Sequence, residues 1–182
     1  NTTGLVPMTD FDGHALWRDR PAEKEIETRR TTWHTPYHAS LSAELARVKA
    51  IHGVAILYDC HSIRSHAPFL FRGTLPDFNI GTNNGTTCDP ALERAASEAC
   101  QQAQGYSMVV NGRFLGGWTT RQYGRPLTGV HAVQMELAQS TYLASETLPF
   151  DYDDAKAALI RAHLAVVLEA LESAAYQLRG TS

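Results

Sequence analysis

Short apolar runs alternate along the chain with longer segments in which apolar residues recur every three or four positions. Four short runs have the length and composition of strands, at residues 54–59, 78–81, 107–111 and 130–137. The longer segments predict helices over residues 21–52, 89–104 and 152–179. Strands that alternate with helices form largely parallel sheets covered on both faces. The pattern therefore predicts an α/β fold with three layers, α/β/α, around a mostly parallel sheet.

Proline, glycine and aspartate mark the ends of these helices. Pro21 suits a first helical turn and Gly53 ends the same segment, whereas Pro36 inside it should kink or divide the helix. Asp89 and Pro90 are a favourable N-cap and first helical residue for the second helix. The first helix is expected to pack through an apolar stripe: Ile26, Trp33, Tyr37, Leu41, Leu45 and Val48.

Composition limits the chain to one domain, residues 1–182, with no membrane or nucleic-acid role. Of its 182 residues, 43% are apolar and 19% are charged, which suffices for one substantial core. A net charge of −3 without lysine or arginine blocks gives no reason to expect nucleic acid as a partner. No apolar run approaches the ~20 residues that span a bilayer. Three cysteines without paired spacing favour a reducing compartment, so we expect a soluble, cytoplasmic protein.

Two polar segments carry candidate chemistry. Asp59 and His61 follow the first apolar run, and Glu136 lies inside the last one. Polar groups at the carboxyl ends of strands face the crevice where α/β proteins bind ligands. A histidine and a glutamate delivered there could act as a metal ligand and a general base, the minimum for metal-assisted hydrolysis. From the residues alone, two readings stay open beside this one: a hydrogen-bonded loop histidine, and a buried glutamate paired with an arginine.

Residues 112–129 form a long, glycine-rich loop with aromatic residues and three arginines, Arg113, Arg121 and Arg125. Loops of this length in compact domains are functional or disordered, and this composition argues against disorder.

Other histidines are weaker candidates. His34 and His38 have metal-ligand spacing on a helix, but Pro36 separates them and no His-Glu-x-x-His motif is present, so we expect packing or surface roles. His131 should face away from Glu136 by strand alternation.

Four segments, in this order, resemble the N-formylglutamate amidohydrolase family: DCHSIRS at residues 59–65, LPDFNIGT at 75–82, NGRFLGGWTTRQYGRP at 111–126 and GVHAVQMELAQSTYL at 129–143. The resemblance implies a zinc-exopeptidase-like (phosphorylase/hydrolase-like) fold and hydrolysis of N-formyl-L-glutamate to formate and L-glutamate in histidine degradation. It further implies that His61 binds Zn²⁺, or another divalent metal, and that Glu136 is the base. Asp59 could then orient the His61 imidazole.

The implied substrate has two carboxylates, which guanidinium groups bind through paired, charge-assisted hydrogen bonds. We expect Arg64 and Arg121 to bind substrate, with Arg113, Arg125 and Asn111 as further candidates and Asn79 as another polar contact. Cys60 is expected to pack rather than to act as a nucleophile, because its neighbour His61 faces the opposite side of a strand.

The resemblance also leaves alternatives. Members of the family carry an N-terminal segment with further metal ligands, which this chain is expected to lack, so that only His61 is a convincing ligand. The chain could then bind an acidic metabolite without catalysis. An enzyme of the same family acting on another N-acyl amino acid is a third reading, and the oligomeric state is left open.

Overall fold

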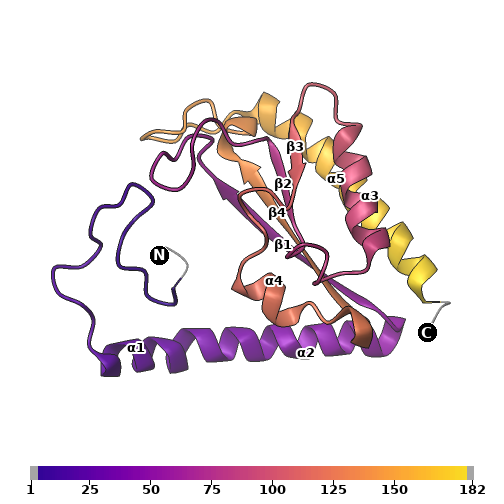
Figure 1. Ribbon diagram of the computed structural model, residues 1–182, viewed down its shortest axis with the longest axis horizontal. Coiled ribbons are helices and arrows are strands. Elements are labelled where there is room, and N and C mark those ends of the chain that lie inside the picture. Colours follow the sequence, from indigo (N-terminus) through magenta and orange to yellow (C-terminus); the bar gives the residue numbers. More distant parts are fainter. Residues whose placement is uncertain (1–3, 180–182) are drawn as a thin grey trace.

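A four-stranded sheet forms the centre of the computed structural model, which describes residues 4–179 (Figure 1). The strands are β1 (Ala55–Ile63), β2 (Phe78–Gly81), β3 (Met108–Val110) and β4 (Val130–Ala138), in the spatial order β1-β4-β2-β3. β1 is parallel to β4 and β2 is parallel to β3, whereas β2 and β4 are antiparallel. The predicted α/β fold and mostly parallel sheet are confirmed, with one antiparallel pairing at the centre.

Two helices cover one face of this sheet, α3 (Pro90–Gln101) and α5 (Asp154–Leu178) (Figure 1). The Asp89 side chain caps α3 by accepting a hydrogen bond from the Ala91 N–H at 2.8 Å, as the sequence predicts. The main core lies between this helix pair and the sheet and includes Phe78, Leu92 and Met135. Side chains alternate along β4, so Gln134 and Glu136 point to the sheet face opposite that of Val133 and Met135.

The first helical segment is continuous: α1 (Glu23–Arg29), a π-helical turn η1 (Arg30–His34) and α2 (Thr35–His52) follow without a break. Pro36 has no N–H and its ring crowds the preceding turn, and the wider π turn directly before it accommodates this interruption. Gly53 ends α2 in the left-handed region, with φ of 77°. The prediction of a kink or break at Pro36 is therefore wrong, since the change of helix type absorbs the proline.

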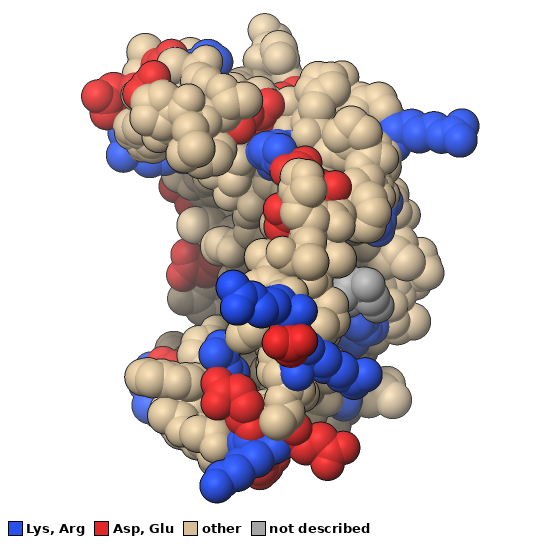
Figure 2. Space-filling model, turned by 90° about the vertical axis from the view of Figure 1, so that its left-hand side faces the viewer, with Lys and Arg blue, Asp and Glu red and all other residues tan. Residues whose placement is uncertain are grey.

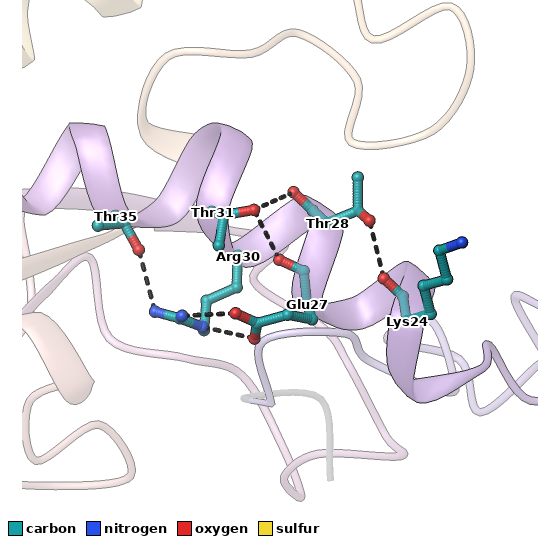
Figure 3. Close-up of polar contacts among 6 residues, drawn as sticks. All are labelled: Lys24, Glu27, Thr28, Arg30, Thr31 and Thr35. Atoms are coloured by element: carbon teal, nitrogen blue, oxygen red, sulfur yellow. Dashed lines mark hydrogen bonds and ion pairs between the residues drawn. The ribbon is translucent and has the colours of Figure 1, made fainter.

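Side-chain contacts reinforce this turn (Figure 3). Arg30 donates two hydrogen bonds, of 2.8 and 2.6 Å, to the Glu27 carboxylate and a third to the Thr35 hydroxyl. The hydroxyls of Thr28 and Thr31 donate to carbonyl oxygens one turn earlier, at 2.8 and 2.9 Å. These contacts are exposed, so each stabilises the helix only slightly.

The predicted apolar stripe of this helix is uncovered at its two aromatic residues. Leu45 is the one buried residue that α2 contains, while Trp33 is 74% exposed and Tyr37 is 61% exposed. Acidic and basic side chains are interspersed on the face of the molecule seen in Figure 2. The helical spacing was predicted correctly, but the expectation that its stripe packs on the domain is wrong for these two aromatic residues.

The long loop contains short helices that the sequence did not predict, α4 (Trp118–Tyr123) and the 3₁₀ turn η2 (Pro126–Thr128); a further 3₁₀ turn, η3 (Gln139–Thr141), follows β4. α4 and the glycines before it lie on the sheet face opposite α3 and α5, because the Gly117 N–H and the Thr120 hydroxyl contact the Gln134 side chain on that face. A Cβ added to Gly81 would lie 2.6 Å from the Gly116 nitrogen, so the loop sits directly on β2. No helix within residues 4–179 has the length and apolar character needed to cross a membrane.

Candidate active site

A cavity of about 400 Å³ opens on the sheet face beneath this loop. Its walls come from β1, β4, the segment 113–121 and the N-terminal arm, which we define as residues 4–20. The lining includes Phe11, His61, Arg113, Arg121, Gln134 and Glu136.

Strand register brings the predicted histidine and glutamate together. In the parallel β1–β4 pair, His61 is the partner of Glu136, and Asp59 is the partner of Gln134. Directly paired residues share a face, so all four side chains belong to the face that the cavity occupies. β1 runs on to Ile63, four residues beyond the predicted end of the strand at residue 59. His61 thus stands on the sheet face rather than in a loop past the strand.

His61 is tied to a carboxylate. Its Nε2 atom lies 3.1 Å from Asp59 Oδ1, and the Thr120 hydroxyl donates to the other Asp59 oxygen at 3.2 Å. The hydrogen bond with Asp59 raises the pKa of His61 above its ordinary value. With Nε2 engaged, Nδ1 is the nitrogen left for a ligand. An imidazole oriented by a carboxylate in this way is typical of metal-ligating histidines.

Glu136 is only 6% exposed, and burial raises the pKa of its carboxyl group to about 7. The Gln134 amide donates a hydrogen bond to Glu136 Oε2 at 3.2 Å. Within residues 4–179, Glu136 forms no salt bridge with an arginine, so the open reading of a structural ion pair finds no support. A buried carboxyl group with a pKa near neutrality is suited to take up and release a proton at physiological pH.

The four candidate arginines do not converge on one point. Arg113 and Arg121 line the cavity; Arg113 donates to the Leu70 carbonyl at 2.9 Å, and Arg121 donates to the Gly116 carbonyl. Arg64 lies outside the lining and pairs with Asp12 of the N-terminal arm at 2.7 Å. Arg125 donates to the carbonyl oxygens of Arg121 and Gly124, both at 2.7 Å, and also lies outside the lining.

The two candidate asparagines bond to the sheet and its loops, and Asn79 is the register partner of Glu136 on β2. Asn111, in the left-handed region at φ 51°, accepts from the Thr82 N–H at 2.9 Å and donates to the Thr82 hydroxyl at 2.8 Å. Asn79 donates to the Glu136 carbonyl at 3.0 Å and is buried. Neither is part of the cavity lining. Both contacts stabilise the sheet and its loops.

The remaining histidines and Cys60 have separate surroundings. The rings of His34 and His38 lie 4.2 Å apart, and His38 Nδ1 is 2.7 Å from the Tyr123 hydroxyl, a packing contact with α4. His131 accepts a hydrogen bond from the Asp89 N–H at 3.1 Å and lies on the sheet face that α3 covers. Cys60 pairs with Met135 in the register, so it belongs to the opposite face from His61; its side chain is exposed, so the expectation that it packs is wrong.

Sequence reasoning missed several contributors, among them Gln134, Thr120 and Phe11. Gln134 and Thr120 form the polar contacts beneath the cavity, and Phe11 of the N-terminal arm lines it. Gln134 could have been found from its spacing, since it precedes Glu136 by two residues on a predicted strand and must share its face. Phe11 and Thr120 carry no comparable signal, because Phe11 lies in an irregular segment and Thr120 in a short helix, α4, that the sequence did not predict.

A separate group of candidate metal ligands lies in the N-terminal arm. Atoms of Asp10, Asp12 and His14 that could ligate a cation lie within 4.8 Å of one another. Asp10 accepts hydrogen bonds from the backbone N–H groups of Asp12 and His14, which explains why the three gather. In the described part of the chain, His61 is not part of any such group of three.

Comparison with known proteins identifies the family of the chain. The family described as N-formylglutamate amidohydrolase matches residues 1–143. N-formylglutamate deformylase of Pseudomonas aeruginosa is 54% identical over 175 residues, which cover 94% of this chain. The enzyme of the same name from Pseudomonas putida is 49% identical over 173 residues, or 93% of this chain. The chain spans 64% of the length of each of these relatives.

Solved structures show the same fold. The crystal structure of N-formylglutamate amidohydrolase from Ralstonia eutropha JMP134 has a TM-score of 0.75 and 24% identity over 94% of this chain and 62% of its own. A gene product from Agrobacterium tumefaciens has a TM-score of 0.67 and 17% identity over 92% of this chain and 62% of its own. At these identities the two structures support the fold alone.

Proposed function

The chain belongs to the N-formylglutamate amidohydrolase family, and we propose that its cavity binds N-formyl-L-glutamate and hydrolyses the formyl amide to formate and L-glutamate. The observation that carries the proposal is the position of Glu136. It is a buried carboxyl group with a pKa of about 7, in register with His61 on the floor of the cavity. The names of the two Pseudomonas relatives supply the substrate.

Arginine side chains account for recognition of an acidic substrate. Arg113 and Arg121 reach the cavity from opposite ends of the segment 113–121. Each donates one hydrogen bond to a backbone carbonyl, which leaves further guanidinium N–H groups for a carboxylate. We assign one substrate carboxylate to Arg121 and the other to Arg113. Arg64 would take part only after releasing Asp12, and Arg125 and Asn111 act indirectly by holding the loops.

The family resemblance implies Zn²⁺ or a related divalent metal. His61, with its imidazole oriented by Asp59, fits the chemistry of a zinc ligand. When bound, the metal supplies Lewis-acid polarisation of the formyl carbonyl and lowers the pKa of water. Within residues 4–179 the cavity does not gather two further protein ligands beside His61, so His61 is the one ligand that this proposal assigns.

Glu136 carries the proton transfers. As a carboxylate it takes a proton from the attacking water, and as a carboxylic acid it delivers that proton to the departing amine nitrogen. A pKa of about 7 allows both forms at neutral pH. Burial beneath the loop also limits water around the carboxyl group, which strengthens its hydrogen bond with the reacting water.

Three finer assignments follow from family membership and belong to the same proposal. They are a zinc-exopeptidase-like arrangement of the sheet, a role in histidine degradation and a cytoplasmic location. The mostly parallel sheet with its site at the carboxyl-terminal halves of β1 and β4 supports the first of these.

Formate release tests the proposed function. The purified chain with added Zn²⁺ is incubated with N-formyl-L-glutamate, N-acetyl-L-glutamate and N-formyl-L-glutamine, and formate or acetate is measured. We expect the highest kcat/KM for N-formyl-L-glutamate, with the chelated protein as the control. Preference for the acetyl compound would assign the chain to another N-acyl amino acid, and no turnover of any substrate would contradict an amidohydrolase.

A further inference from the structure

Gln134 lines the cavity beside Glu136. It is 4% exposed and lies two residues before Glu136 on β4, so both side chains belong to the same face. Its partners across the sheet are Asp59 on β1 and Gly81 on β2. Gln134 therefore adjoins the base, the carboxylate that orients His61 and the strand on which the glycine loop sits.

The contacts of Gln134 fix which way its amide points. The Gly117 N–H can only donate, and it lies 2.5 Å from Gln134 Oε1, so this end must be the oxygen. The Thr120 hydroxyl approaches the same oxygen at 3.5 Å. The NH₂ group then faces Glu136 and donates to its Oε2 atom at 3.2 Å. Within residues 4–179, the second carboxylate oxygen accepts no hydrogen bond and is left for proton transfer.

The same contacts connect the base to the substrate-binding loop. Gly117 is the N-cap residue of α4, and Arg121 of α4 donates to the carbonyl of the neighbouring Gly116. Gly81 seats this pair of glycines on β2, where a side chain would overlap Gly116. A single hydrogen-bonded path thus runs from Arg121 through the Gly116–Gly117 backbone and Gln134 to Glu136.

We propose that Gln134 is a positioning residue for the hydrolysis. Its NH₂ group holds one oxygen of Glu136, so that the other faces the reacting atoms, and its carbonyl oxygen ties the base to the loop that carries Arg121. The assignment of Glu136 as the base rests on the proposed function. A residue that only anchored α4 would need its carbonyl oxygen but not its NH₂ group, and this difference can be measured.

Two variants separate the ends of the amide. Gln134→Met keeps the length of the side chain and removes both hydrogen bonds. Gln134→Glu keeps an acceptor for Gly117 and replaces the amide donor with a second carboxyl group beside Glu136, which repels its charge or shares its proton. Tyr123→Phe is the matched control, because it removes the contact of α4 with His38 and leaves Glu136 untouched. The full chain with added Zn²⁺ is assayed with N-formyl-L-glutamate for kcat and KM, and hydrogen exchange of the Gly117 amide is followed by NMR.

Positioning predicts a loss in kcat for both Gln134 variants, about 10- to 100-fold, with KM changed by less than about threefold. The Gly117 amide should exchange faster in Gln134→Met and stay protected in Gln134→Glu, and Tyr123→Phe should keep kcat within about threefold. Wild-type kcat in Gln134→Glu, or a loss in either variant carried by KM alone, would overturn the positioning role. If the wild-type chain releases no formate, the proposed function fails first and the positioning role fails with it.

Discussion

The sheet face around Glu136 and the helix formed by α1, η1 and α2 differ in the burial and bonding of their side chains. On the sheet face, Gln134 and Glu136 are buried, and their polar groups are bonded to each other and to Gly117. Along the helix, Trp33 and Tyr37 are exposed, and the ion pairs are exposed contacts between near neighbours in sequence. Buried polar groups must find partners, whereas exposed ones need none. Substitutions on the sheet are therefore expected to change stability and activity more than substitutions on the exposed helix.

The first prediction sharpens this difference through stability. Phe78 is fully buried in the main core, so Phe78→Ala should lower the free energy of unfolding by about 3–5 kcal/mol. Trp33→Ala removes a larger side chain that is mostly exposed, so the free energy of unfolding should change by no more than about 0.5 kcal/mol. Urea unfolding followed by circular dichroism measures both. Equal losses would mean that the exposed helix face is covered in solution.

A second prediction uses pH. Burial raises the pKa of Glu136 to about 7 from an ordinary value of 4.5, so the folded state favours the neutral acid. This contribution to stability is present below pH 4.5 and is lost as pH rises through 7. Metal-free Glu136→Gln should therefore be more stable than metal-free wild type at pH 8, by about 1–3 kcal/mol, with the gain absent at pH 4. Thermal unfolding at the two pH values measures it; a gain of the same size at both would point to packing instead.

The third prediction separates two arginines of one loop. Arg121→Lys keeps the charge but loses the planar fork, so binding of N-formyl-L-glutamate should weaken by about 1–3 kcal/mol. Arg125→Lys is the matched control, because Arg125 lies outside the cavity lining and bonds backbone carbonyls. The two variants are compared through kcat/KM. Similar losses would show that Arg121 acts on the loop rather than on the substrate.

Sequence pattern predicted the sheet better than the helix that crosses its end. Alternation along residues 130–137 placed Glu136 opposite to His131, and the structure has them on different faces because strand periodicity leaves no choice. Helical spacing found the first helix but could not tell whether its stripe is covered, since Trp33 and Tyr37 fit either case. Pro36 was misjudged because a π turn is a rare solution that local rules do not anticipate.

The candidate site divides in the same way. His61 and Glu136 could be brought together from two predicted strands, but their register required the structure. The roles of Arg64 and Asn111 depended on partners distant in sequence, Asp12 and Thr82, which no spacing reveals. Their predicted contacts with substrate remain predictions, and the structure gives each of them another contact. Gln134 was within reach of alternation and was overlooked.

The smallest expected effect concerns the N-terminal arm. Asp12 and Arg64 form an ion pair that is partly exposed on both sides, so Asp12→Asn should lower stability by no more than about 1 kcal/mol. Asp19→Asn, an exposed aspartate of the same arm, is the control. Thermal unfolding at low and high salt measures the difference. If Asp12→Asn lowers the free energy of unfolding by more than about 2 kcal/mol, the arm contributes to stability as the sheet face does and not as the exposed helix does.

The central claim is that Glu136, buried beneath the glycine-rich loop, is the base of a formyl-amide hydrolysis. The most direct measurement is kcat of Glu136→Gln with N-formyl-L-glutamate, in protein whose circular dichroism and bound metal match the wild type. The amide keeps the size of the side chain and cannot accept the water's proton, so kcat should fall by about 10²- to 10⁴-fold. A kcat within about threefold of wild type would contradict the claim and leave Glu136 a buried structural residue of β4.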